Sequence, residues 1–374
     1  MKKLLTIILV VLQIGMARAQ IMAWRTPMQQ KNDPYVCGRA WNTEIGDAYF
    51  RMPQRMEKQL PKAVWSLSHN SAGLYVKFKT DSKKISVRYL LSNQTRYAVN
   101  MTPYNHSGID LYVKVDGKNH WIPNQSKTRL TMTKGDTARF NFIDLNTAVF
   151  PSGMGEYTLY LPTYNSIKGL EIGVDPNATF SFIRESMEKK PIVIYGTSIA
   201  HGASASRPGM IWTNILQREL NYPIINLGFS GSALCEPSVF DALCEIDARI
   251  YIIDAVPNCH GLNDSTFNAR LRDGIKKLRN HTSAPIILAE SNALPKPAYA
   301  KCRDDGMFRI DLKQQEIYKN LRKKGVKGLY YISRKDFGFT EDDYIEGVHP
   351  NDLGMRKYAD AYKKLLIKLL KKKQ

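Results

Sequence analysis

Residues 191–198 read Pro191-Ile192-Val193-Ile194-Tyr195-Gly196-Thr197-Ser198, a continuous apolar run that ends in a glycine and two hydroxyl residues. A run of this kind, without polar alternation, is typical of a strand that is covered on both faces, as in a parallel sheet. Similar runs follow, separated by helix-like stretches, at 224–227, 250–255, 286–289 and 329–332. This alternation predicts a flavodoxin-like, three-layer α/β domain with a parallel sheet between helices.

The helices of this half are predicted from apolar side chains at helical spacing. They lie around 211–220, 267–278, 312–323 and 354–370. The last of them mixes lysines and leucines between 363 and 370, a composition that is also found in membrane-binding helices. We expect its leucines to pack on the sheet and its lysines to remain solvated.

Before residue 185 the chain has a different pattern of apolar and polar residues. Short runs in which apolar and polar side chains alternate occur at 74–79, 85–89, 111–115, 139–142, 157–161 and 170–174. Turn-forming pairs such as Asp116-Gly117 separate them. This pattern predicts an antiparallel, jelly-roll-like β-sandwich that no helix interrupts. We therefore divide the mature chain into a β-sandwich domain, residues 20–185, and an α/β domain, residues 186–374.

Residues 1–19 have the pattern of a secretory signal peptide. Lys2 and Lys3 precede an apolar run over 4–16, and Ala17-Arg18-Ala19 offers a small-residue cleavage site. The run is too short to span a bilayer comfortably, and no later segment is long and apolar enough to do so. We expect an exported protein that is periplasmic or secreted and has no stable membrane insertion after cleavage.

Charge and cysteine content limit the partners and cofactors. The formal net charge is +20, and removal of Lys2, Lys3 and Arg18 with the signal peptide leaves +17. The lysines are spread along the chain without a nucleic-acid motif, so we expect a basic surface and no nucleic-acid partner. The odd number of cysteines leaves at least one thiol unpaired in a monomer, and no CxxC or HExxH spacing indicates a metal site or another cofactor. The cysteines are Cys37, Cys235, Cys244, Cys259 and Cys302.

Residues able to carry chemistry follow three of the predicted strands and precede the last helix. In parallel sheets, functional groups gather beyond the carboxyl ends of the strands. Each of these residues also has an ordinary structural role as an alternative, such as helix capping or a turn. Their order along the chain favours one shared crevice. The segments are 196–198, 226–231, 254–258 and 346–350.

In this order the segments resemble the SGNH/GDSL hydrolases. Gly196-Thr197-Ser198-Ile199 is similar to the first block, with threonine where many members have aspartate. Gly231 matches the second-block glycine, and Asn258 matches the third-block asparagine, although Val-Pro-Asn replaces the usual Gly-x-Asn-Asp. His349, in Gly-Val-His-Pro-Asn-Asp, matches the fifth block. Upstream, Gly108-Ile109-Asp110-Leu111-Tyr112 resembles the Gly-x-Asp-Leu-Tyr signature of a domain that precedes one SGNH subgroup.

The resemblance implies a role for each matched residue. Ser198 would be the nucleophile and His349 the general base. The backbone N–H groups of Ser198 and Gly231, with the side-chain amide of Asn258, would stabilise the oxyanion. Ser204 and Ser206 are other serines near the strand end, but they lie outside the matched block.

The residue that orients His349 is left open by the sequence. The family usually has an aspartate three residues before the histidine, and this chain has Glu346 there. Glutamate can orient an imidazole, but its extra methylene requires a shifted backbone or rotamer. Asp343 or a backbone carbonyl are the alternatives.

The function expected from the resemblance is that of an exported serine esterase that removes small acyl groups, acetyl foremost, from a polysaccharide or from a small-molecule ester. A lipid or thioester hydrolase is the second enzymatic interpretation. A glycan-binding protein without catalysis is the third, because Thr197, Glu346 and the setting of Asn258 depart from the family pattern. Tyr104, His106 and Trp121 either face a sugar or pack in the sandwich.

Overall fold

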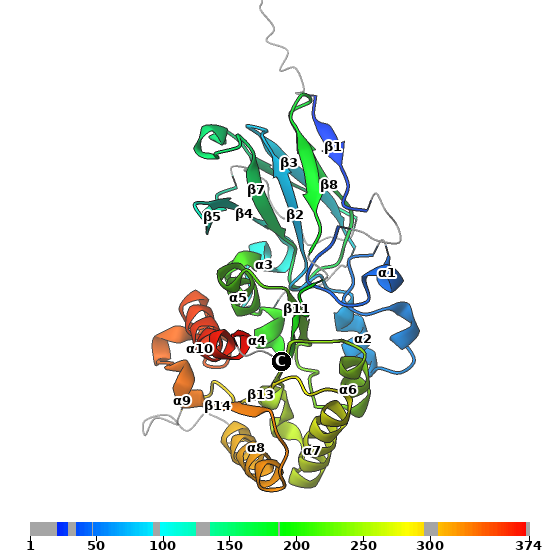
Figure 1. Ribbon diagram of the computed structural model, residues 1–374, viewed down its shortest axis with the longest axis vertical. Helices are drawn as coiled ribbons and strands as arrows, with labels where there is room; N and C mark the ends of the chain where they lie inside the picture. The colour runs from blue at the N-terminus through cyan, green and yellow to red at the C-terminus, as the bar shows by residue number, and fades with distance from the viewer. Residues whose placement is uncertain are drawn as a thin grey trace, which may run out of the picture.

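The computed structural model describes residues 21–28, 35–46, 48–92, 98–124, 135–185, 188–294 and 306–371. Two antiparallel sheets lie at one end of the molecule, and a parallel sheet with helices on both faces lies at the other (Figure 1). The predicted signal peptide and Cys302 are outside the described residues. Within those residues, no helix is long and apolar enough to cross a membrane.

The antiparallel sheets form the predicted sandwich. The four-stranded sheet has the order β1 (Ala23–Arg25), β8 (Ile167–Val174), β3 (Ile85–Leu91) and β6 (Thr137–Phe142). The five-stranded sheet has the order β5 (Lys118–Ile122), β4 (Asp110–Val115), β7 (Gly155–Tyr160), β2 (Tyr75–Thr80) and β9 (Phe180–Ile183). Inward side chains of both sheets, such as Phe78, Leu159, Val87 and Phe140, share one apolar core. The two-residue period therefore places one face of each sheet in this core.

The parallel sheet confirms the α/β prediction. Its order is β11 (Ile224–Gly228), β10 (Ile192–Gly196), β12 (Ile250–Asp254), β13 (Ile286–Ala289) and β14 (Leu329–Ile332). In chain order this is 2-1-3-4-5, the flavodoxin-like arrangement. Both faces of β10 are buried: Val193 and Tyr195 enter one core, and Ile192 and Ile194 enter the other. The continuous apolar run follows from this two-sided burial.

Helices cover the two faces of the parallel sheet (Figure 1). One apolar core lies under α6 (Pro237–Cys244), α7 (Asp264–His281) and α8 (Gly306–Lys323). The opposite core lies under α5 (Trp212–Leu220), α9 (Arg334–Phe337) and α10 (Asp352–Leu370). In α10, Leu366 and Leu369 are buried while Lys364 and Lys368 are exposed, so the lysine-rich end packs on the sheet as expected.

The prediction that no helix interrupts the first half is wrong. This half contains α1 (Asn42–Ile45), the 3₁₀ turns η1 (Gln54–Met56) and η2 (Thr147–Val149), α2 (Lys62–Ser68) and α3 (Pro103–Ser107). The 3₁₀ turns have three residues and the α-helices four to seven, too few for the apolar period to stand out. Tertiary contacts stabilise α2, because Val64 and Trp65 are buried in the core of the parallel sheet.

A segment of the first half packs on the second domain. Met52, Met56 and Leu60 share an apolar core with Tyr195 and Leu227 of the parallel sheet. In Figure 1, α2 lies beside α6 rather than against the sandwich. The chain therefore crosses to the α/β domain and returns before it completes the sandwich. The division at residue 185 remains a prediction and describes the path of the chain only approximately.

Arg51 anchors this crossing. Its guanidinium is buried and donates hydrogen bonds to the carbonyl oxygens of Leu67 at 2.6 Å and Asn70 at 2.9 Å. It also donates to the carbonyls of Asn226 at 3.2 Å and Gly228 at 2.7 Å, at the carboxyl end of β11. Burial lowers the pKa of Arg51 to about 9. One side chain thus joins the crossing segment to the end of a central strand.

We expect Arg51→Met to lower the free energy of unfolding by about 3 kcal/mol or more, because it leaves buried carbonyl groups without donors. Chemical denaturation of both proteins measures the difference. Arg55→Met is the matched control: Arg55 is 43% exposed and pairs with Glu44 and Glu245 on the surface. Arg55→Met should lower the free energy of unfolding by about 1 kcal/mol or less. Equal losses in the two variants would contradict the anchoring role of Arg51.

Candidate active site

Ser198 stands at the junction of β10 and the short helix α4 (Ser198–His201). Thr197 caps this helix, and its side chain accepts a hydrogen bond from the backbone N–H of Ile199 at 3.3 Å. The helix lies tightly against β11, since a Cβ on Gly228 would stand 2.3 Å from the backbone nitrogen of His201. Threonine in place of the family's aspartate therefore serves as the cap, and Ser198 keeps 9% of its surface exposed.

Ser198, His349 and Glu346 form a continuous chain of contacts. The Oγ of Ser198 lies 2.7 Å from Nε2 of His349. The other ring nitrogen of His349, Nδ1, contacts Oε1 of Glu346, which also accepts a hydrogen bond from the backbone N–H of His349 at 3.2 Å. The side chain of His349 is 22% exposed and that of Glu346 is 40% exposed. The three groups have the connectivity of a serine–histidine–acid triad.

The loop that carries His349 is fixed by its backbone. The N–H of Ile345 donates to the carbonyl of His349 at 3.0 Å. The side-chain amide of Asn292, just beyond β13, donates to the carbonyl of Val348 at 2.9 Å. Asn351 then caps α10 through the N–H of Leu353 at 2.9 Å. The imidazole is thus held between a strand end and a helix start.

Asp343, the alternative partner of the histidine, makes other contacts. Its carboxylate accepts hydrogen bonds from the N–H of Thr340 at 2.6 Å and from Nζ of Lys357 at 2.7 Å. Burial alone would raise the pKa of Asp343, but these bonds outweigh it and hold the pKa below its usual value. The structure therefore brings Glu346, rather than Asp343, to His349.

Gly231 and Asn258 lie on neighbouring loops at the same edge of the sheet. Gly231 has φ +67°, in the left-handed region that favours glycine, and nothing lies within 4 Å of a Cβ built on it. Asn258, in the turn η4 (Val256–Gly261), donates from Nδ2 to the carbonyl of Phe229 at 3.3 Å. The N–H of Phe229 in turn donates to the carbonyl of Gly196 at 2.8 Å. These contacts join the second and third segments to the strand that leads to Ser198.

Neither of the other two candidate serines hydrogen-bonds to a histidine within the described part of the chain. Ser206 donates from its backbone N–H, at 2.8 Å, and from Oγ, at 2.5 Å, to the carboxylate of Asp352. The Oγ of Ser204 is buried. Ser206 therefore ties the loop after α4 to the start of α10.

The sandwich domain reaches the histidine through Asn100, which the sequence analysis missed. The side-chain amide of Asn100 lies 3.1 Å from Nδ1 of His349. Nearby, Thr102 donates from Oγ1 to the carbonyl of Ser206 at 2.6 Å, and Asn105 donates from Nδ2 to the carbonyl of Gly202 at 2.7 Å. These bonds dock the segment before β4 onto the loop after Ser198. No motif marks Asn100, so only the docking of the two domains reveals it.

Among the aromatic candidates of the sandwich, one is exposed. Tyr104 packs on the sandwich core, and His106 is buried and stacks on Tyr164. Burial lowers the pKa of His106 to about 4. Trp121, in contrast, is 43% exposed on β5. Trp121 is therefore the one of these three that presents a large surface to solvent.

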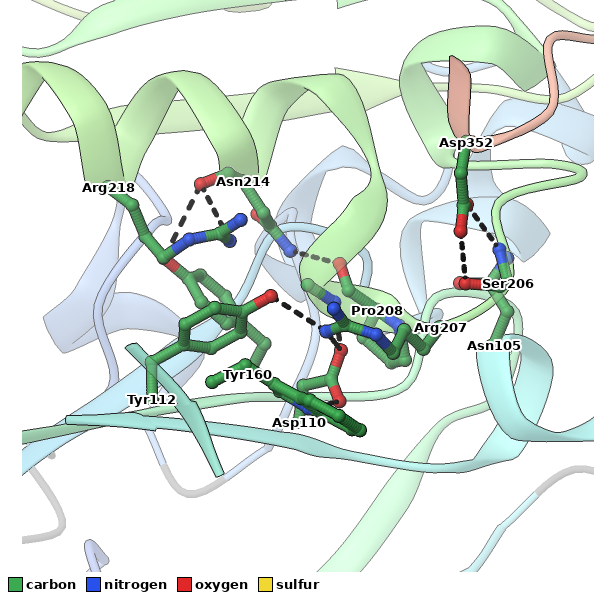
Figure 2. Close-up of polar contacts among 12 residues, drawn as sticks. Asn105, Asp110, Tyr112, Tyr160, Ser206, Arg207, Pro208, Asn214, Arg218 and Asp352 are labelled. Atoms are coloured by element: carbon green, nitrogen blue, oxygen red, sulfur yellow. Dashed lines mark hydrogen bonds and ion pairs between the residues drawn. The ribbon is translucent and has the colours of Figure 1, made fainter. Parts of the chain in front are cut away.

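The Gly-x-Asp-Leu-Tyr segment joins the two domains (Figure 2). The buried carboxylate of Asp110 accepts hydrogen bonds from Nη1 of Arg207 at 2.8 Å and from the N–H of Gly209 at 2.7 Å. Tyr112 accepts from the same Nη1 at 2.7 Å. Burial raises the pKa of Asp110, and the attraction of Arg207 opposes this rise. The aspartate and tyrosine of the motif thus both bind the loop after Ser198.

The described cysteines are free thiols. They are Cys37, Cys235, Cys244 and Cys259. The sulfur atoms of Cys235 and Cys259 lie 3.9 Å apart in the protein interior. Within the described ranges, no group of three or more histidine, cysteine or acidic residues could hold a metal ion.

Comparison with known families agrees with this arrangement. Residues 189–367 match the model of the GDSL-like lipase/acylhydrolase family. Residues 22–180 match the model for the N-terminus of SGNH-hydrolase-type esterases, named GxDLY. A search of curated proteins finds no match. The chain belongs to the GDSL-like lipase/acylhydrolase family and carries the N-terminal domain of its SGNH-type esterases.

Solved structures with the same fold include a Bacteroides ovatus protein assigned as a GDSL-like lipase. It is 32% identical, with a TM-score of 0.81 over 94% of this chain and 99% of that one. The salicylyl-acyltransferase SsfX3 of a tetracycline biosynthetic pathway is 20% identical, with a TM-score of 0.71 over 95% and 99%. A family two carbohydrate esterase from Cellvibrio japonicus is 12% identical, with a TM-score of 0.54 over 80% and 90%. The last two likenesses concern the fold alone.

Asp254 is a buried carboxyl group behind this edge of the sheet. It ends β12 and accepts a hydrogen bond from the hydroxyl of Tyr358 at 3.1 Å. Burial raises the pKa of Asp254 to about 8, although the hydrogen bond from Tyr358 acts in the opposite direction. The carboxyl group of Asp254 therefore keeps its proton up to about pH 8 in the folded protein, whereas in the unfolded chain it loses the proton at about pH 4.

We expect Asp254→Asn to become more stable relative to the wild type as the pH rises from 5 to 9. Between the unfolded and folded pKa values the folded state binds the extra proton, so wild-type stability falls with rising pH, and asparagine removes this loss. Thermal unfolding midpoints at pH 5, 7 and 9 measure the trend. Asp116→Asn, at an exposed turn, is the control and should show a smaller change. A constant difference for Asp254→Asn would contradict the raised pKa.

Proposed function

We propose that this protein is an exported serine esterase that removes small acyl groups, acetyl foremost, from carbohydrate. The observation that carries the proposal is the contact chain from Ser198 Oγ to His349 Nε2 at 2.7 Å and from His349 Nδ1 to Glu346. A serine hydroxyl becomes an effective nucleophile when a neighbouring base accepts its proton during attack. Membership of an acylhydrolase family fits this chemistry.

In the first half of the proposed reaction, Ser198 Oγ attacks the acyl carbon of the ester while its proton passes to Nε2 of His349. The tetrahedral intermediate then collapses: its bond to the sugar oxygen breaks, and His349 returns the proton to that oxygen. The products are the free sugar hydroxyl and an acyl-serine. Glu346 keeps the imidazole in the required tautomer and stabilises its charged form.

In the second half, water replaces the sugar. His349 accepts a proton from the water as its oxygen attacks the acyl-serine, and the proton then returns to Ser198 Oγ with release of the carboxylic acid. Both intermediates carry an oxyanion, which we assign to the N–H groups of Ser198 and Gly231 and the amide of Asn258. In the described part of the chain, no backbone hydrogen bond uses the N–H of Ser198 or Gly231.

The surroundings of Ser198 favour a short acyl group on a polar carrier. The half-buried side chain of Asn100 contacts His349, Asn258 is half-buried on a loop at the same edge of the sheet, and Gly231 is exposed. Polar groups of this kind suit sugar hydroxyls better than a long hydrocarbon chain. The fold shared with a family two carbohydrate esterase supports the same substrate class. The predicted signal peptide supports export to where polysaccharides are found.

The two other interpretations predict different behaviour. A lipid or thioester hydrolase on the same machinery would prefer long acyl chains or thioesters. A glycan-binding protein without catalysis would hydrolyse no ester, although Ser198 and His349 are in contact. Hydrolysis of esters with acyl chains of different length distinguishes these two interpretations from the proposed esterase.

We expect residues 20–374 to hydrolyse p-nitrophenyl acetate faster than the corresponding butyrate and octanoate. Ser198→Ala should lose at least about 10³-fold in kcat, as is usual when a catalytic nucleophile is removed. Release of acetate from acetylated xylan tests the carbohydrate assignment.

Ser206→Ala is the matched control, because Ser206 lies on the loop after Ser198 and contacts Asp352 at the start of α10, not the histidine. It should keep most of the activity. Equal activity in the Ser198→Ala variant would exclude the mechanism. A preference for octanoate would favour the lipid hydrolase, and no activity in the folded wild type would favour the glycan-binding protein.

We expect Glu346→Gln to reduce kcat by about 10²-fold or more, since a neutral amide can neither stabilise the imidazolium nor enforce its tautomer. Steady-state kinetics between pH 5 and 9 measure the loss. Asp343→Asn is the control and should change kcat only a few-fold in the folded protein, because Asp343 binds Thr340 and Lys357. Nearly full activity of Glu346→Gln would show that the carboxylate of Glu346 is not needed to orient His349.

A further inference from the structure

A pocket of about 550 Å³ lies where the two domains meet. Residues of β4 and β5 in the sandwich form one wall, and residues of α5 and α10 in the α/β domain form the other. Asn119 of β5 spans the junction by donating from Nδ2 to the carbonyl of Arg218 at 3.2 Å. Neither domain forms this pocket alone.

The pocket is strongly cationic. Glu219 is the one acidic side chain among the described residues that line it. It is already paired, with Nη1 of Arg356 and with Nζ of Lys363 at 2.7 Å. The cationic lining residues are Lys118, Arg207, Arg218, Arg356 and Lys363. The positive charge therefore exceeds what the lining carboxylate can balance.

Two of these cations have no carboxylate partner within ion-pair distance in the described part of the chain. Arg207 is paired with Asp110 at 2.8 Å, whereas Lys118 and Arg218 have no such pair. Lys118 is exposed on β5, and Arg218 is partly buried on α5. A partly buried guanidinium without a counter-ion favours an anion from solution.

Arg218 is held in one orientation (Figure 2). Its guanidinium carbon lies 4.0 Å from the ring centre of Tyr112 and 5.3 Å from that of Tyr160. Its Nη1 donates to the carbonyl of Asn214 at 3.1 Å. The planar group has five N–H donors, so donors remain for a ligand in the pocket. Fixing the side chain in advance reduces the entropic cost of binding.

Trp121 adds an aromatic surface to the same pocket. Its indole is 43% exposed, and its Nε1 donates to Asp110 at 3.0 Å, which fixes the ring. The guanidinium of Arg207 lies 4.4 Å from the ring centre. A fixed aromatic ring beside cationic donors matches a ligand that has both an apolar face and an acidic substituent.

We infer that this pocket binds the carboxylate of an acidic sugar residue in the acylated polysaccharide. Arg218 binds the carboxylate through its planar donors, Lys118 adds a second positive charge, and Trp121 packs against the sugar ring. This inference rests on the proposed carbohydrate esterase function, for which it names the substrate class: glycans that contain uronic acid.

The test measures binding to the inactive Ser198→Ala protein, residues 20–374, by isothermal titration calorimetry. The probes are tetragalacturonate, tetramannuronate and a hyaluronate tetrasaccharide, with methyl-esterified tetragalacturonate as the uncharged counterpart. We expect at least one acid to bind, more weakly at 0.5 M than at 0.05 M NaCl because salt screens charge. Methyl esterification should abolish binding of tetragalacturonate if that is the acid bound.

Adding Arg218→Gln should weaken that binding by about 10- to 100-fold, the usual cost of a hydrogen bond to a charged group. Adding Lys118→Gln should weaken it by about 2- to 5-fold, because Lys118 is exposed and contributes charge alone. Arg322→Gln removes the same charge from an exposed site on α8 and should leave the affinity unchanged. Lys118 is exposed, so its variant remains informative if Arg218→Gln unfolds.

Several outcomes would overturn the inference: no binding of any of the three acids, equal binding of the methyl ester, or unchanged affinity in both pocket variants. Tighter binding of a sulfated tetrasaccharide than of every uronate would exclude the carboxylate as the group bound. Because Ser198→Ala is inactive by design, binding does not depend on which ester is cleaved. Failure of the esterase assay and failure of this inference are therefore separate results.

Discussion

The buried guanidinium of Arg51 is the interaction on which the arrangement of the two domains depends. It binds two carbonyls of the crossing segment and two at the carboxyl end of β11. That strand end leads into the loop of Gly231, one of the candidate oxyanion residues. A guanidinium with several donors can satisfy carbonyl groups from two distant parts of the chain at once. This contact between the two halves of the chain therefore also fixes one side of the candidate site.

Most of the fold could be predicted because burial on both faces leaves a simple pattern. Each strand of the parallel sheet begins within two residues of its predicted position, as Ile192 and Ile250 illustrate. The short strands β1 and β9, and the edge strand β5, were missed. Buried and exposed side chains do not alternate along β5, because Lys118, His120 and Trp121 are all exposed to solvent. Helix α2 was missed because its seven residues are too few for the apolar period to stand out, and contacts with the core of the parallel sheet stabilise it.

The candidate site was predictable where it depends on short motifs and unpredictable where it depends on docking. The motifs indicated the strand ends that bring Ser198 and His349 together, and they left open whether Glu346 or Asp343 faces the imidazole. That choice depends on Lys357, one helix turn into α10, which holds Asp343 away from the ring. Asn100 carries no motif, and it reaches His349 only because Thr102 and Asn105 dock on the loop after Ser198.

The contact between Asn100 and His349 has a consequence for how proteins of this architecture diversify. A residue of the sandwich touches the imidazole, while Asp110 and Tyr112 of the same domain bind the loop that follows Ser198. Recombination that joined this α/β domain to a foreign sandwich would replace all three contacts at once. An insertion or deletion between β3 and α3 would therefore change the surroundings of the histidine, although Asn100 and His349 are 249 residues apart in the sequence.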